Sequence, residues 1–217
     1  EYGVKVDYLK KDEETATGHA IIQVSHSENC IILYGGANQL IDEAQIDEVL
    51  THFEKGDLLL IQNEISSLTY LISKAHEKGL RIAFNTAPMD EKIFGYPLDL
   101  IDIFVVNEVE GKGLANVSSD QVEDVIVGLQ KAYPNKEIIL TVGSQGSYYI
   151  SGEMVIHQEA YRVEAVDTTA AGDTFTGFYL ASILRGETVS DALRIAAKAS
   201  SITVTKEGAA KSIPTLE

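Results

Sequence analysis

Residues 166–178 have the sequence Val-Asp-Thr-Thr-Ala-Ala-Gly-Asp-Thr-Phe-Thr-Gly-Phe. The fold and function predicted for the whole chain depend mainly on this stretch. Residues 163–166, at its start, are rich in β-branched side chains, which predicts a short buried strand. Ala170, Ala171 and Gly172 follow as a turn with almost no side chains, so their N–H groups can be approached closely. Apolar residues then recur at helical spacing, and the start of a helix attracts anions through its free N–H groups and dipole. The stretch therefore predicts a strand, an anion-binding turn and a helix.

Asp173 stands at the point where an anion bound by this turn would arrive. A carboxylate beside a transferring phosphoryl group can act as the general base for a hydroxyl nucleophile. An aspartate in the first turn of a helix also has an ordinary structural role, since it compensates the helix dipole. Position in the sequence leaves both roles open.

Strand-like and helix-like segments alternate along the rest of the chain. Strands are expected at 57–62, 80–84, 101–106 and 138–142, helices after 42, 68, 118 and 174, and a last helix that carries Ala192 to Ile202. This order predicts a three-layer α/β/α fold with a largely parallel sheet, read as one domain over residues 1–217. Residues 15–36 add two strands, at 17–24 and 30–34, which are expected to form a lid. Such sheets bind ligands at the carboxyl ends of their strands, where the polar and glycine-rich turns of this chain fall.

Composition narrows the classes of function. The 217 residues are 45% hydrophobic, enough for one good core, and the net charge of −16 argues against nucleic-acid or anionic-membrane partners. Cys30 is the only cysteine, so an intrachain disulfide is excluded and a cytoplasmic location fits. No apolar run is long enough to span a bilayer.

Two further patterns each allow a structural and a functional interpretation. Asn107 and Glu110, three residues apart after a strand, fit a helix capping box or a functional amide and carboxylate that share one helix face. Thr141-Val-Gly-Ser-Gln-Gly146 fits a plain hairpin turn or a backbone contact to nucleotide phosphates.

The string Asp167-Thr-Thr-Ala-Ala-Gly-Asp-Thr-Phe-x-Gly177 closely resembles the C-terminal signature of the ribokinase-like (PfkB) sugar kinases. The likeness runs from Thr17-Gly-x-Ala-x-Ile22 to the tail at Ser212-Ile-Pro214. It implies that Asp173 is the catalytic base and contacts the sugar, and that the turn at 170–172 is the anion hole.

The resemblance also implies ligands at other positions. It implies nucleotide contacts at Asn107, Thr141, Gly143, Ser144, Gln145, Gly146 and Gly172, and a sugar contact at Glu64. It implies Mg²⁺ near Glu110, and K⁺ held by Asp167, Thr169, Thr203, Lys206, Gly208 and Ser212.

The reaction implied by the resemblance is ATP-dependent phosphorylation of a sugar, with O5 of D-ribose as the best-fitting acceptor. Kinases of fructose, ketodeoxygluconate or adenosine remain alternatives, as does a non-catalytic nucleotide- or sugar-sensing module. Family members begin with a strand carrying an acidic sugar contact and a Gly-Gly-Lys-Gly-x-Asn loop, which are absent here. We therefore expect a C-terminal portion of such a kinase, unstable and inactive alone, that forms a homodimer through its lid strands when complete.

Overall fold

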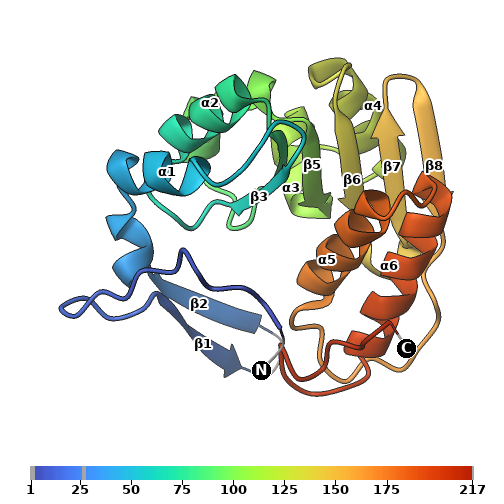
Figure 1. Ribbon diagram of the computed structural model, residues 1–217. Helices are drawn as coiled ribbons and strands as arrows, with labels where there is room; N and C mark the ends of the chain where they lie inside the picture. The colour runs from blue at the N-terminus through green and yellow to red at the C-terminus, as the bar shows by residue number, and fades with distance from the viewer. Residues whose placement is uncertain (1–2, 26–27, 217) are drawn as a thin grey trace. The chain divides into compact units, whose positions relative to one another are not determined.

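The computed structural model describes residues 3–25 and 28–216 of the chain, without the side chains of residues 22–31 (Figure 1). Contacts between Cα atoms divide these residues into two compact units. The first contains the residues up to 83 together with 87–101, and the second contains 84–86 together with the residues from 102 onward. The one-domain organisation expected from the sequence stays a prediction.

The first unit contains a separate β-hairpin and an α/β segment. Its elements are β1 (His19–Ser25), β2 (Glu28–Tyr34), η1 (Gly36–Leu40), α1 (Glu43–Leu50), β3 (Leu58–Gln62), α2 (Leu68–Lys78), the first part of β4 (Arg81–Asn85), η2 (Glu91–Gly95) and η3 (Leu98–Leu100). β1 and β2 pair antiparallel, with His19 opposite Tyr34. The two strands expected between residues 15 and 36 are present, while residues 26–27 of their turn lie outside the described residues.

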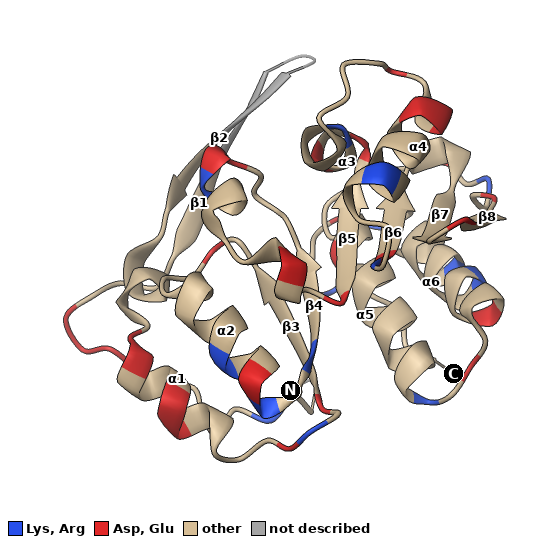
Figure 2. Cartoon of the chain, turned by 90° about the horizontal axis from the view of Figure 1, so that it is seen from above, with Lys and Arg blue, Asp and Glu red and all other residues tan. Residues whose placement is uncertain are grey.

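Local sequence explains the helix that follows the hairpin. Asp42 precedes α1, and its carboxylate accepts a hydrogen bond of 2.8 Å from the N–H of Gln45, as expected of an N-cap. Ile46 and Leu50 lie one turn apart and are buried, so they anchor the inner face of the helix. The outer face is acidic, as the red segments of α1 in Figure 2 show.

The second unit is built on the remaining strands. Its elements are the end of β4, β5 (Ile103–Asn107), α3 (Glu108–Ala115), α4 (Val122–Ala132), β6 (Glu137–Thr141), η4 (Gly143–Gln145), β7 (Ser147–Ser151), β8 (Met154–Gln158), α5 (Ala171–Leu184) and α6 (Val189–Thr203). β5 pairs parallel with β6, whereas β6 with β7 and β7 with β8 are antiparallel. Within this unit the strands follow the order β5-β6-β7-β8.

Helices cover both faces of the sheet in the second unit. In Figure 2, α3 and α4 lie on one side of β5–β8, and α5 and α6 lie on the other. The sheet residues between them are apolar and fully buried, among them Phe104, Ile138, Ile139 and Leu140. This arrangement confirms the predicted three-layer α/β/α fold.

The strand predicted at 163–166 is not formed. This segment is irregular, with a bend at Val166, and the side chains of Val163 and Val166 are 43% and 59% exposed. The N–H groups of Val166 and Asp167 both donate to the carbonyl of Val204 at the end of α6, over 2.8 and 3.2 Å. β-branched residues favour a strand only where a neighbouring strand pairs with them, and here a helix end accepts those hydrogen bonds instead.

Candidate active site

The start of α5 places the predicted anion-binding turn and Asp173 together. The helix begins at Ala171, three residues earlier than expected, so Gly172 and Asp173 belong to its first turn and are exposed. Ala170 is the N-cap residue and has a left-handed backbone with φ of 61°. This conformation costs a residue with a Cβ about 1–2 kcal/mol, and such strain concentrates at functional sites.

The N–H groups of this turn are partly used within the fold. The N–H of Ala171 donates to the carbonyl of Thr168 over 3.2 Å, and the N–H of Thr174 donates to the carbonyl of Ala170 over 2.9 Å. Among the described residues we find no hydrogen-bond acceptor for the N–H of Gly172. Of the three residues predicted to form the anion hole, Ala171 therefore has its donor engaged.

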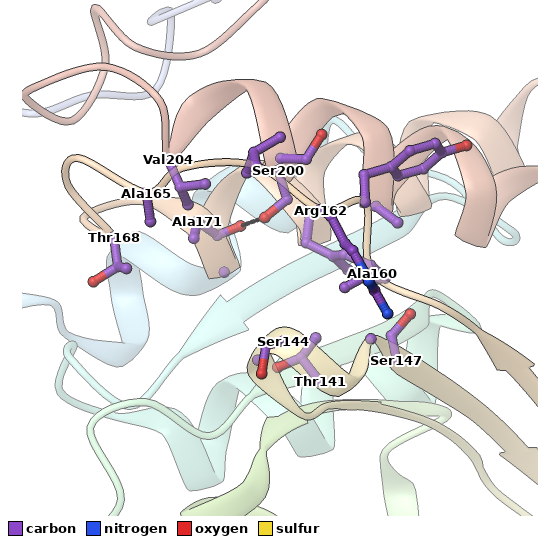
Figure 3. A pocket seen from close by; sticks show the side chains of 18 residues that line it. Thr141, Ser144, Ser147, Ala160, Arg162, Ala165, Thr168, Ala171, Ser200 and Val204 are labelled. Atoms are coloured by element: carbon purple, nitrogen blue, oxygen red, sulfur yellow. Dashed lines mark hydrogen bonds between the residues drawn. The ribbon is translucent and has the colours of Figure 1, made fainter.

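Hydroxyl groups that the sequence analysis did not select hold this turn in place. Ser200 on α6 donates to the carbonyl of Ala171 over 3.0 Å, the bond drawn as a dashed line in Figure 3. Thr176 donates to the carbonyl of Gly172 over 2.8 Å. No signal in the sequence indicates this role of Ser200, because 29 residues separate it from Ala171 and only the packing of α6 on α5 brings the two together.

A cavity of about 520 Å³ opens beside the start of α5. Figure 3 shows side chains from the turn after β6, from the segment between β8 and α5, and from α6 around it. Five of the predicted nucleotide contacts line it, namely Thr141, Gly143, Ser144, Gly146 and Gly172. Most of the other lining residues are small or apolar, including Ala165, Phe175, Ala197 and Val204. A largely apolar pocket beside exposed N–H donors suits a ligand with a flat ring and an anionic group.

Two of the predicted nucleotide residues do not line this cavity. Asn107 caps α3, and the carbonyl of Gln145 lies 2.9 Å from Nε2 of His157. Gly146 also has a reason within the fold for being glycine. Its φ is 99°, and a Cβ there would lie 2.0 Å from the carbonyl oxygen of Gln158. A close backbone approach therefore requires this glycine, whether or not a phosphate binds nearby.

Asn107 and Glu110 form a reciprocal capping box at the start of α3. Oδ1 of Asn107 accepts from the N–H of Glu110, while the backbone N–H and Nδ2 of Asn107 donate to Oε2 and Oε1 of Glu110, each over 2.9 Å. The Glu110 side chain is buried, and this burial raises the pKa of its carboxyl against the opposing effect of those hydrogen bonds. The capping role that the sequence allowed for Asn107 and Glu110 is therefore confirmed.

The capping box remains compatible with a hydrated cation. Each carboxylate oxygen of Glu110 accepts one hydrogen bond from Asn107, and the Thr86 side chain also acts on this carboxylate and lowers its pKa. Among the described residues no three His, Cys, Asp or Glu side chains gather as a ligand cluster. Mg²⁺ keeps several waters and needs as few as one carboxylate, so Glu110 fits it only in that hydrated form.

Replacing Asn107 with alanine should lower the free energy of unfolding by about 1–3 kcal/mol, because the cap and one hydrogen bond to a buried carboxylate are lost. In the wild-type protein, the hydrogen bond from the Asn107 side chain lowers the pKa of Glu110. Its loss should therefore raise the folded-state pKa further above the unfolded value. The added penalty is absent below the unfolded pKa and complete above the folded one, so the loss should be larger at about pH 8 than at about pH 5.

Urea unfolding at both pH values measures this effect. Asp42→Ala, which removes the N-cap of α1 without touching a buried acid, is the matched control and should cost about 1 kcal/mol at either pH. An Asn107→Ala loss that does not change with pH would contradict the expected effect on Glu110.

The structure brings together the two loops predicted to hold K⁺. Oδ1 of Asp167 accepts from the N–H of Thr169 over 2.8 Å, and Oδ2 accepts from the N–H of Gly208 over 2.9 Å. Hydrogen bonds from the Thr169 side chain, the Gly208 N–H and the Thr169 N–H lower the pKa of Asp167. The carboxylate therefore stays charged and joins residues 41 positions apart.

The other predicted K⁺ ligands make hydrogen bonds within the C-terminal segment or to α5. The hydroxyl of Thr203 lies 3.1 Å from that of Thr174, and its carbonyl accepts from the N–H of Lys206 over 3.1 Å. The Ser212 side chain is buried and donates to the carbonyl of Ala209 over 2.6 Å. Asp167, Thr169 and Gly208 thus form the connected part of the predicted set, and their binding of K⁺ stays a prediction.

Glu64, the predicted sugar contact, belongs to the first unit. Glu64 is exposed, and its carbonyl accepts a hydrogen bond of 2.7 Å from Nε2 of Gln39.

Within the described residues, no helix combines the length and apolarity needed to cross a membrane.

Known proteins are similar to this chain in both sequence and fold. Ribokinase from Schizosaccharomyces pombe is 37% identical over 228 residues, which cover 99% of this chain and 70% of that protein. The structure of Arabidopsis thaliana ribokinase with ribose and ATP has a TM-score of 0.80 and 30% identity, covering 93% of this chain and 67% of that one. Ribokinase from Cryptococcus neoformans with ADP has a TM-score of 0.85 and 29% identity, covering 97% and 72%.

The comparison with family models agrees over nearly the whole length. Residues 1–216 match the model described as pfkB family carbohydrate kinase, which includes the stretch around Asp173 and the loops joined by Asp167. The chain therefore belongs to the pfkB family of carbohydrate kinases.

Proposed function

We propose that this chain carries the nucleotide-binding and catalytic part of an ATP-dependent kinase that phosphorylates O5 of D-ribose. The observation that carries the proposal is the start of α5, where an exposed carboxylate, Asp173, follows an exposed glycine beside the cavity of about 520 Å³. Support for ribose and ATP comes from the three ribokinases named above, one of them solved with both molecules.

Chemistry at the start of α5 follows from its geometry. With ATP in the cavity, the γ-phosphoryl group would lie at the helix start, where N–H groups and the helix dipole stabilise its charge. Asp173 would accept the proton of the attacking sugar hydroxyl as its oxygen bonds to the γ-phosphorus. The bond from that phosphorus to the β–γ bridging oxygen breaks, and ADP leaves. Positioning and electrostatics supply most of the acceleration in such transfers.

Cations complete the proposed site. Glu110 would hold Mg²⁺ through water, and this ion neutralises phosphate charge when bound. Asp167, Thr169 and Gly208, with Thr203, Lys206 and Ser212 nearby in sequence, would hold K⁺ and keep the turn before α5 in shape. We also propose that Glu64 contacts the sugar, that β1 and β2 act as a lid and pair between two copies, and that the enzyme works in the cytoplasm.

The test is an assay of the full-length protein that contains this chain. With ATP and Mg²⁺, we expect kcat/KM to be higher for D-ribose than for 2-deoxyribose, fructose, ketodeoxygluconate or adenosine, with the product identified as the 5-phosphate by ³¹P NMR. Preference for another acceptor would overturn the assignment of ribose. Binding of ATP without transfer to any of these acceptors would favour a sensing module instead.

A further inference from the structure

Ser200 makes a contact that the folding of its own helix does not require. A serine inside a helix commonly bonds to a carbonyl of the preceding turn, as the neighbouring Ser201 does with Lys198 over 2.7 Å. Ser200 instead reaches from α6 to α5 and donates to the carbonyl of Ala171 (Figure 3). Alanine has a higher helix propensity than serine, so this contact offsets a small local cost to α6.

The acceptor of this bond belongs to the peptide group that matters most at the site. The carbonyl of Ala171 and the N–H of Gly172 are the two ends of one planar peptide group. Whatever orients the carbonyl oxygen therefore also orients the N–H on the opposite side. A hydrogen bond to the carbonyl also polarises the group and strengthens its N–H as a donor.

The next peptide group is held in the same way. Thr176 donates to the carbonyl of Gly172, whose peptide group carries the N–H of Asp173. Its side chain is buried, and its bond stays within α5. Two successive peptide groups at the helix start thus each have a hydroxyl on the carbonyl, one from the same helix and one from α6.

We propose that Ser200 is a positioning residue that holds the N–H of Gly172 toward the γ-phosphoryl group during transfer. This inference rests on the proposed kinase function of the same site. Ser200 acts through the peptide group of Ala171 and Gly172, so it should affect the transfer step more than nucleotide affinity.

The experiment compares Ser200→Ala with wild type in the full-length protein, using ATP and D-ribose. The loss of one hydrogen bond to the peptide group should lower kcat by about 3- to 10-fold and leave the KM for ATP within about 2-fold. Ser200→Thr keeps the hydroxyl and should restore most of the rate. Ser73→Ala is the matched control, because its hydroxyl also donates to a helix carbonyl, that of Thr69 over 2.8 Å, but on α2. This control should leave kcat unchanged.

The other possible results distinguish the positioning role of Ser200 from the proposed kinase function. A Ser200→Ala protein with wild-type kcat, or one with only a lower melting temperature, would overturn the positioning role while the kinase activity stands. An increase in KM for ATP at constant kcat would overturn it too, since it would show a direct nucleotide contact. A wild-type protein that phosphorylates no sugar would instead overturn the proposed function.

Discussion

Asparagine at position 173 should lower kcat for sugar phosphorylation by about 10²- to 10⁴-fold, the range that general-base catalysis contributes. The amide has nearly the shape of the carboxylate but cannot accept the proton of the attacking hydroxyl. Asp173 lies in the exposed first turn of α5, so the substitution should not disturb the core. ATP affinity should stay within about 3-fold or increase, because a negative charge beside the phosphates is removed. Steady-state kinetics and calorimetric titration of ATP measure the two quantities.

A second acidic residue at a helix start provides the control. Asp191 lies in the first turn of α6, where its N–H donates to the hydroxyl of the N-cap residue Thr188 over 3.1 Å. If Asp173 only compensated a helix dipole, Asp173→Asn would, like Asp191→Asn, have a small effect on stability and none on kcat. Equal kcat values for the two variants would remove Asp173 from the mechanism.

Alanine at position 172 should lower kcat by about 10²-fold and leave the fold intact. The backbone of Gly172 does not have a positive φ, and a Cβ built there meets no atom within 4 Å. The described residues therefore give no steric reason for glycine at this point. A bound phosphoryl group would supply that reason, since a methyl group would keep it away from the N–H donors, whose loss typically costs 10²- to 10³-fold.

Stability should change in the opposite direction to activity. Alanine is the better helix former, so Gly172→Ala should raise the free energy of unfolding by about 0.5 kcal/mol. Gly177 is a close control, because it lies in the same helix, is exposed and also has open space around a Cβ. Gly177→Ala should stabilise the protein by about 0.5–1 kcal/mol with unchanged kcat. Similar activity of the two variants would show that no ligand approaches Gly172 closely.

Much of the fold could be predicted because its determinants are local. The runs 57–62, 80–84, 101–106 and 138–142 became β3, β4, β5 and β6 with shifts of one or two residues at their ends. The capping box at Asn107 was one of two interpretations open from the sequence, since a reciprocal cap needs only two residues three positions apart. The strand at 163–166 was wrong, because strand formation depends on a neighbour that no local pattern specifies.

The sequence by itself determined the layered α/β fold and the place of Asp173 and Gly172 at a helix start, because periodicity and helix-terminal chemistry act over a few residues. The family resemblance placed Asp167 and Gly208 in one K⁺ set, but only the tertiary structure showed the hydrogen bond between them and the bond from Ser200 to the carbonyl of Ala171. Those contacts span 41 and 29 residues, and they exist because the buried faces of α5 and α6 pack against each other. Hydrophobic packing is not directional, so the local sequence does not show which polar groups it will bring into contact.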